Sequence, residues 1–318
     1  MLGLLLAVLL LVAGAALLTL GAEAFAEHVT AASARLQVSV LALALLLAGA
    51  EPEEAVTAML AAGQGHPALA AGDAIGANLV IMTLTLGLAA VVAPLPVNRR
   101  AVEYAVASAV VGAVAWLFLR NGLLGRVEGA ALVLLYVAGV VWVWRREHAP
   151  PVIGELAELE DEDDGEADDE ATGRALLWVL GGLLGMVVGG ALAVRGAEGL
   201  VDAFGVGESV VGLTVLALAT SAEMVALVWS ARRRGLTEVV VAGTVGAVAY
   251  NATVTLGLAA LVNPLGLGRH NPVLTVAALT AVLPLVLLLG RRTGHLPRVV
   301  GFALVAGYVV AVGVLFAR

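Results

Sequence analysis

The sequence contains no cysteine and no lysine, and it has few aromatic and few charged residues. Only 4% of its 318 residues are aromatic and 13% are charged, whereas soluble domains contain about 25% charged residues. The absence of cysteine excludes a disulfide framework and a thiolate metal site, and all 17 basic residues are arginines. Hydrophobic residues make up 61% of the chain, and the mean hydropathy is +1.02. This composition predicts a polytopic membrane protein.

Apolar runs long enough to cross a bilayer, about 20 residues each, recur along the whole chain. The first run, at residues 1–20, has no basic region before it, so we interpret it as a span and not as a cleaved signal. We expect an all-α fold with ten transmembrane helices, at residues 2–22, 36–62, 69–93, 101–119, 123–144, 174–200, 207–231, 237–262, 271–290 and 297–317.

The distribution of arginine predicts how the chain sits in the membrane, because short cytoplasmic loops carry an excess of positive charge. With the N-terminus outside, twelve of the arginines face the cytoplasm and five face outward. The opposite orientation reverses this ratio. The missing lysine and an acidic loop are typical of some prokaryotes. We therefore predict a multi-pass protein of a prokaryotic cell (inner) membrane, with both termini outside.

One stretch of the sequence occurs twice. Shifted by 170 positions, residues 39–95 align with residues 209–265 without a gap, and 19 of the 57 positions are identical. The identities include the pairs Glu53/Glu223 and Gly76/Gly246. Each half has five predicted spans, an odd number, so the second half enters the membrane from the opposite side. Inverted repeats of this kind are the architecture of many secondary transporters, whose sites lie where the repeats meet.

The predicted organisation has three parts: a first repeat at 1–144, an acidic cytoplasmic linker at 145–173 and a second, inverted repeat at 174–318. Eleven acidic residues lie between Glu155 and Glu170. We interpret the linker as a solvated, disordered segment. Weak regulatory cation binding is the alternative, although the linker lacks the ligand spacing of an EF-hand.

Acidic residues interrupt the apolar runs at equivalent places in the two repeats. Glu51, Glu53 and Glu54 do so in the first repeat, and Glu223 does so in the second. A charge at mid-bilayer costs about 2.5–3.5 kcal/mol, so such groups persist mainly where they face a polar cavity or a partner. Carboxylates are ligands for hard cations such as Ca²⁺. The alternative is that these acids mark the ends of loops.

Neutral oxygen groups accompany these acids. Thr220 and Ser221 lie three and two residues before Glu223, while Asp73, Asn78 and Asn251 follow on the next span of each repeat. The predicted cation ligands are therefore Glu53, Glu54, Glu223, Thr220, Ser221, Asn251, Asn78 and Asp73.

Other polar residues are expected to be structural. The pairs Thr83/Thr85 and Thr253/Thr255 are expected to bond backbone carbonyls within their own helices. We assign no role to His66, Tyr104 or Tyr250. The segments 21–23 and 196–198, both Gly-Ala-Glu, are interpreted as turns at the membrane interface, with guarding of the entrance as the minor alternative.

These residues resemble the cation/Ca²⁺ antiporter superfamily, specifically the membrane region of the sodium/calcium exchangers. The repeats of that family carry Gly-Thr-Ser-Leu-Pro-Glu, followed by Gly-Asn-x-x-Gly-Ser-Asn-x-x-Asn. Residues 219–224 and 246–251 match this spacing, and the resemblance covers nearly the whole chain. It implies an exchanger fold and exchange of Ca²⁺ against Na⁺ by alternating access.

The resemblance carries over only part of the family's ligand set. The family glutamate falls on Glu54 in the first repeat but on Met224 in the second. The family's second-helix serine falls on Ala77 and Ala247, and its final Asn or Asp falls on Ile81 and Asn251. Fewer coupling-ion sites are therefore expected than the family usually has.

The sequence therefore predicts a secondary active cation antiporter, with Ca²⁺ and Na⁺ as transported ions and no cofactor. An H⁺/cation exchanger and a non-transporting paralogue that serves as a membrane scaffold are the alternatives. An enzyme is not expected, because the sequence has no nucleophile–His–acid set, no HExxH motif and no phosphate-binding glycine loop. The expected partners are the lipid bilayer and inorganic cations, without nucleic acid, and the oligomeric state stays open.

Overall fold

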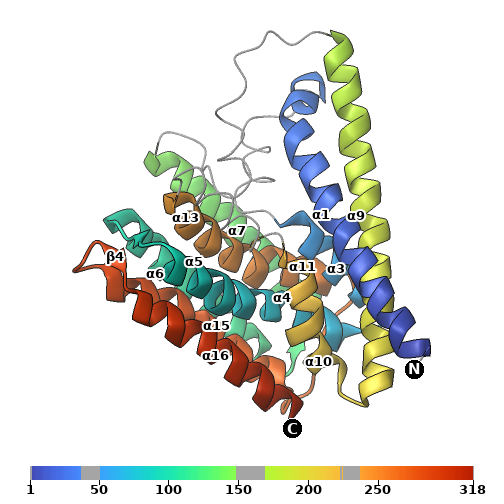
Figure 1. The fold of residues 1–318 in the computed structure, drawn as a ribbon. Helices are drawn as coiled ribbons and strands as arrows, with labels where there is room; N and C mark the ends of the chain where they lie inside the picture. The colour runs from blue at the N-terminus through green and yellow to red at the C-terminus, as the bar shows by residue number, and fades with distance from the viewer. Residues whose placement is uncertain (1, 37–50, 148–168, 223, 225–236, 318) are drawn as a thin grey trace.

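The computed structural model describes residues 2–36, 51–147, 169–222, 224 and 237–317, and these form a bundle of helices (Figure 1). The first half contains α1 (Leu2–Leu36), α3 (Pro52–Gly63), α4 (Pro67–Leu79), the π-helical turn η1 (Val80–Thr85), α5 (Leu86–Val92), α6 (Arg99–Leu119) and α7 (Arg126–Glu147). The second half contains α9 (Asp169–Phe204), α10 (Glu208–Val211), the π-helical turn η2 (Gly212–Leu216), α11 (Ala217–Thr220), α13 (Thr237–Tyr250), the π-helical turn η3 (Asn251–Thr255), α14 (Leu256–Val262), α15 (Pro272–Val282), the 3₁₀ turn η4 (Leu283–Gly290) and α16 (Arg298–Phe316).

Eight of the ten predicted spans are described as helices long and apolar enough to cross a membrane. The other two, at 36–62 and 207–231, include undescribed residues, and their described parts form α3 and the run from α10 to α11. The first residues of α1 and the last of α16 lie at the same end of the bundle in Figure 1, as an even number of spans requires. The prediction of an all-α, ten-span fold is confirmed.

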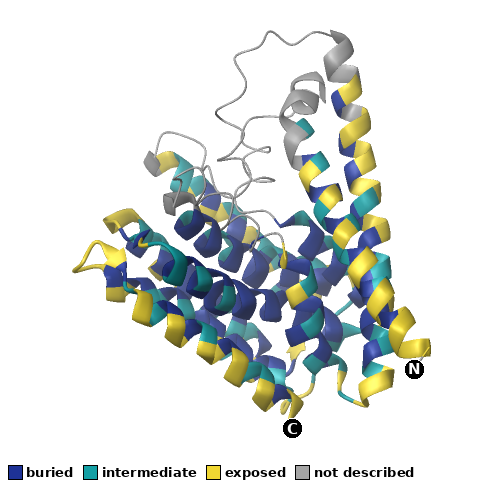
Figure 2. Ribbon diagram, in the orientation of Figure 1, coloured by how far each residue is buried: buried dark blue, intermediate teal, exposed yellow. Residues whose placement is uncertain are grey.

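The bundle has a buried centre and an apolar outer surface. In an 18-residue apolar window of the span formed by α4, η1 and α5, 78% of residues are buried, compared with 22% in the corresponding windows of α1 and α16. The outward faces of α1, α9 and α16 are exposed (Figure 2), and they carry large apolar side chains such as Leu5, Leu184 and Phe302. These faces meet lipid, whereas the polar groups of α4 are enclosed by protein.

Two short ladders tie the halves together. β1 (Leu95–Pro96) of the first half pairs with β4 (His295–Leu296) of the second, and β2 (Leu123–Leu124) pairs with β3 (Leu265–Gly266). β1 and β3 are separated by the repeat shift of 170 residues, and each pairs with a strand from the other half. This reciprocal pairing is the signature of two repeats related by a pseudo-two-fold axis.

Glycines allow the helices of the two halves to approach closely. A Cβ added at Gly76 on α4 would lie 2.7 Å from the Cα and O atoms of Leu213, and one at Gly212 would lie 2.7 Å from the carbonyl oxygen of Leu69. Small residues permit such backbone contact between helices in membranes. The crossing of α4 over η2 brings Asp73 next to Thr220.

The longest helices, α1 and α9, pack on one another through a second glycine seam. A Cβ at Gly14, Gly189 or Gly196 would lie within 2.5–2.8 Å of backbone atoms of the facing helix. The helix α1 continues beyond its predicted end at residue 22. The helix α9 begins before residue 174 and ends after residue 200, its predicted bounds. The segments 21–23 and 196–198 therefore lie inside helices, and their interpretation as interfacial turns is wrong.

We expect Gly76→Ala to destabilise the protein, because the added methyl group meets backbone atoms that have no room to shift. Overpacking of this kind costs about 1–3 kcal/mol. Gly139→Ala on α7 is the matched control, since nothing lies within 4 Å of a Cβ at that position. The measurement is the melting temperature of each variant in detergent. Equal melting temperatures for the two variants would contradict the close crossing of α4 and η2.

Candidate functional site

Helix irregularities gather at the centre of the bundle. α3 begins at Pro52, and Glu51 before it has non-helical angles of φ −103° and ψ 77°. α11 ends at Thr220, with Ser221 as its C-terminal cap residue. The π-helical turns η1 and η3 interrupt the equivalent spans of the two repeats. Broken helices and π turns free backbone groups at membrane depth and often mark functional sites.

Among the described residues, four acidic side chains lie at this centre, and all four come from the first half. Glu51 precedes α3, Glu53 and Glu54 are in its first turn, and Asp73 is on α4. All four residues are at most 3% exposed. The N-terminus of a helix carries a partial positive charge, so the start of α3 favours carboxylates in the position where these glutamates lie.

Neutral groups of the second half reach across to these acids. Ser221 Oγ donates to Glu54 Oε1 at 2.7 Å, and Asn251 Nδ2 donates to Glu51 Oε2 at 2.8 Å. Thr220 Oγ1 lies 3.1 Å from Asp73 Oδ1. Each of these contacts joins an acid of one repeat to a neutral side chain of the other.

Several oxygens of this region are buried without a hydrogen-bond donor. Native proteins pair most buried polar atoms, so each exception calls for a reason. Among the described residues of this region, these oxygens include Glu51 Oε1, Glu54 Oε2, Asp73 Oδ2, Asn78 Oδ1 and Thr85 Oγ1. The carboxyl groups of Glu51 and Glu54 also lie in contact with each other. Carboxylate, amide and hydroxyl oxygens are the ligands that hard cations prefer.

Acidic groups alone do not form a ready metal site. Among the described residues, no group of three or more His, Cys, Asp or Glu side chains is arranged to hold a metal ion. A cation at this centre would therefore depend on neutral oxygens as well as on the carboxylates. Ser221 and Thr220 already touch the acids and are in place to supply them.

A buried apolar cluster contains Met224, close to Ser221 in the chain. Met224 is 5% exposed and belongs to one buried cluster with Ala77, Ile81 and Ala247. These are the positions at which the sequence departs from the exchanger motif. Their apolar side chains pack together, so this cluster offers no side-chain oxygen at these four positions.

The structure brings some of the predicted ligands together and places others elsewhere. Glu54, Asp73, Thr220, Ser221 and Asn251 come together as described above. Asn78 donates to the carbonyl of Val248 at 3.2 Å and so links α4 to α13. Glu53 is buried in the first turn of α3, and its peptide carbonyl accepts from Thr57 Oγ1. Glu223 lies outside the described residues.

Sequence reasoning left Glu51 out of the ligand set, although the structure places it against Asn251. One signal was present: Glu51 directly precedes Pro52, where a helix has to begin. Among the threonines, Thr83 and Thr253 bond carbonyls four residues earlier, as expected. Thr255 instead donates to Asn251 Oδ1 at 2.9 Å.

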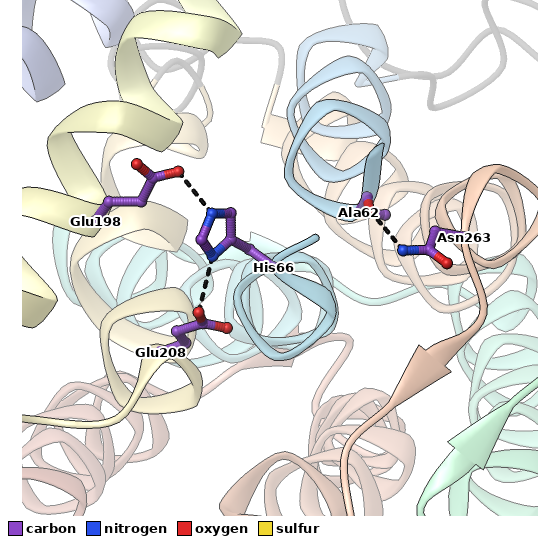
Figure 3. A network of polar contacts seen from close by, with 5 residues as sticks. All are labelled: Ala62, His66, Glu198, Glu208 and Asn263. Carbon is purple, nitrogen blue, oxygen red and sulfur yellow. Dashed lines mark hydrogen bonds and ion pairs between the residues drawn. The ribbon is translucent and has the colours of Figure 1, made fainter. Parts of the chain in front are cut away.

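A second polar cluster lies near the end of the bundle where α3 is joined to α4 (Figure 3). The imidazole of His66 lies between two carboxylates, with Nε2 2.9 Å from Glu198 Oε1 and Nδ1 2.8 Å from Glu208 Oε1. The expectation that His66 belongs to no constellation of polar residues is therefore wrong. The three residues come from positions 66, 198 and 208, and no sequence spacing indicates that they meet.

Comparisons with known proteins agree with this geometry. A sequence model of the family described as "Sodium/calcium exchanger protein" matches residues 3–145 and 174–317. The putative antiporter CaxA of Alkalimonas amylolytica is 27% identical, over 93% of this chain and 93% of its own length. The inner membrane protein YrbG of Escherichia coli K12 is 28% identical, over 98% of this chain and 97% of its own.

A solved structure has the same fold. The sodium-calcium exchanger NCX_Mj, soaked with Na⁺ and Sr²⁺, superposes with a TM-score of 0.64 at 21% identity, and the match covers 98% of each chain. At that identity the likeness establishes the fold alone. Together with the family match over both halves of the sequence, it shows that the chain belongs to the sodium/calcium exchanger family.

Proposed function

We propose that this protein is a secondary active antiporter that exchanges Ca²⁺ for Na⁺ through the central cluster of acids. Membership of an exchanger family supports cation antiport in general. The observation that favours Ca²⁺ is the set of buried carboxylate oxygens without donors, on Glu51, Glu54 and Asp73. A bound divalent cation would satisfy these oxygens and offset the cost of burying their charge.

The contacts between repeats suggest how binding is coupled to movement. Ser221, Thr220 and Asn251 of the second half donate hydrogen bonds to the acids of the first half. A cation on the carboxylates takes over the role of these donors, and the hydroxyl oxygens of Ser221 and Thr220 can turn toward the ion as ligands. The interface between the two halves therefore depends on occupancy, as alternating access requires.

Exchange of a cation for H⁺ is the second candidate. The carboxyl groups of Glu51 and Glu54 are in contact, and two adjacent carboxyl groups repel one another when both are ionised. A proton on one of them would remove this repulsion and would leave when a cation binds. The same centre would then exchange protons for a divalent cation without Na⁺.

The orientation stays part of the proposal. Both termini are placed outside, and the residues between α7 and α9 are placed in the cytoplasm, because this arrangement puts twelve of the 17 arginines on the cytoplasmic side.

Reconstituted protein should take up ⁴⁵Ca²⁺ into liposomes when an outward Na⁺ gradient drives the exchange. Glu54→Gln should reduce the initial rate of uptake by at least about tenfold, since an interaction with a charged group is worth about 1.5–3 kcal/mol. Glu103→Gln is the matched control, because Glu103 pairs with the exposed Arg99 at the surface of α6. Uptake under a pH gradient alone would favour the H⁺-coupled candidate. No uptake under either gradient, with folded protein, would favour the non-transporting scaffold.

Ser221→Ala should weaken Ca²⁺ binding by about tenfold, since it removes a hydroxyl oxygen that can turn from Glu54, 2.7 Å away, to the ion. An interaction with a charged group contributes about 1.5–3 kcal/mol. Binding can be followed as the Ca²⁺-dependent rise in melting temperature. Ser108→Ala is the control, because the buried hydroxyl of Ser108 on α6 makes no hydrogen bond. Equal Ca²⁺ affinities in the two variants would argue against Ser221 as a ligand.

A further inference from the structure

The two repeats contribute unequally to the centre. Under the 170-residue shift, Glu54 corresponds to Met224 and Glu51 corresponds to Ser221. The second repeat thus has an apolar side chain where the first has a carboxylate. In return, the first repeat has a carboxylate where the second has a hydroxyl. The number of acids at these four positions is two, and both come from the start of α3.

The contacts of Met224 and Glu51 agree with this difference between the two repeats. Met224 packs in an apolar cluster with Ile81 and Ala247. Glu51 instead reaches the second half, where Asn251 Nδ2 donates to its Oε2. Thr255 donates to Asn251 Oδ1 and fixes the direction of that amide. The position of Glu51 is therefore stabilised by a chain of two hydrogen bonds.

Glu51 and Glu54 are also arranged as a pair. Residues three apart near a helix start lie on the same face, and the two carboxyl groups are in contact. Each keeps one buried oxygen without a donor, Oε1 of Glu51 and Oε2 of Glu54. Two adjacent carboxylates supply the negative charge that balances one divalent cation.

We propose that Glu51 is a specificity-determining ligand that replaces the carboxylate missing at Met224, so that one divalent cation is held by Glu51 and Glu54 of the first repeat and by neutral oxygens of the second. This inference rests on the proposed cation-binding function, and it assigns the two charged ligands to Glu51 and Glu54. The second repeat contributes position and hydrogen bonds, through Asn251 and Ser221, while the first contributes the charge.

The test measures ⁴⁵Ca²⁺ binding to purified full-length protein, which does not depend on transport. Glu51→Ser should weaken binding by at least about tenfold, a loss of about 1.4 kcal/mol. Adding Met224→Glu to Glu51→Ser should recover most of that loss, because it returns the carboxylate to the repeat-equivalent position. Glu51→Gln, which keeps the shape of the side chain, replaces Glu51→Ser if that variant does not fold.

The outcomes separate this inference from the proposed function. If wild-type protein binds no Ca²⁺, the proposed function is wrong and the assignment of Glu51 fails with it. If wild-type protein binds but Glu51→Gln binds equally well, only the role of Glu51 is overturned. The same holds if Met224→Glu changes affinity equally in the wild-type and Glu51→Ser backgrounds, since a replacement of one charge by another requires that the two substitutions be coupled.

The cluster around His66 carries a second, independent inference. The ring nitrogens point to opposite sides, Nε2 toward Glu198 on α9 and Nδ1 toward Glu208 at the start of α10 (Figure 3). A neutral imidazole has one N–H group, whereas an imidazolium has two. Carboxylates only accept, so both contacts form together when the imidazole is protonated.

The charges that face the ring come from Glu198 and Glu208 alone among the described residues. Arg195 and Asp202 on α9, and Arg269 and His270 before α15, are exposed and form no hydrogen bond or ion pair with the imidazole. On the α3 side, Gln64 is uncharged, and Asn263 before β3 donates to the carbonyl of Ala62. On α1, residues 2–22 carry no charged side chain, and Glu23 is the first charged residue along the helix.

The cluster links the α1–α9 pair to the central helices. His66 directly precedes α4, which carries Asp73 into the centre, whereas Glu198 belongs to the α1–α9 pair. We infer that His66 is a proton-sensitive tie between this pair and the central helices. Protonation holds α9, α10 and α4 together, and loss of the proton releases one of the two carboxylates.

The chain has no cysteine, so spin labels can be placed at Gln64→Cys and Asp202→Cys, both exposed positions. Histidine changes its charge between about pH 5 and 8. We expect the population at the longer label distance to rise at least about twofold from pH 5 to pH 8.5. His66→Gln should abolish this response, while His270→Gln, an exposed histidine, should retain it. A response that persists in His66→Gln, or its absence in the wild type, would overturn the tie.

Discussion

The burial of four carboxyl groups inside an apolar bundle is the constraint on which the rest of the structure depends. Glu51, Glu53, Glu54 and Asp73 are almost completely enclosed. An isolated charge in such surroundings is costly unless it is paired or coordinated. The start of α3 provides a helix N-terminus, and the second half provides hydroxyl and amide donors. The helices are broken where they are because these polar groups are needed at that depth.

The glycine contacts make this arrangement possible. The donors Thr220 and Ser221 reach the acids because η2 crosses α4 at Gly76 and Gly212 without side chains between the backbones. A larger residue at the crossing would separate Asp73 from Thr220 and leave a buried carboxylate unpaired. The packing of the two halves and the polarity of the centre are therefore one property of the fold. This coupling is what a transporter with a site between two repeats requires.

The sequence predicts the fold well because its strongest signals are local or periodic. Apolar runs and an ungapped repeat specify the spans and their inversion, and the motif around Thr220 and Ser221 indicates the family. The ends of α1 and α9 are less predictable. Both helices continue through polar residues such as Glu23 and Glu198, and their glycines pack against the backbone of the partner helix. The meeting of His66 with Glu198 and Glu208 depends on packing between distant segments, and no spacing in the chain encodes it.

Glu51 shows why a site built between repeats cannot be judged one position at a time. Compared with the exchanger motif, Met224 looks like the loss of an essential ligand, and a loss of this kind suggests an inactive protein. In three dimensions, Glu51, Glu54 and Ser221 meet at one centre, and Met224 follows one turn after Ser221. A carboxylate missing at position 224 is therefore replaceable at position 51, as proposed above. The electrostatic requirement of a divalent cation concerns the total charge and the distances around it, not the helix that supplies each oxygen. A duplicated fold offers two equivalent places for each ligand, and this chain places both charges on the repeat whose helix begins, rather than ends, at the centre.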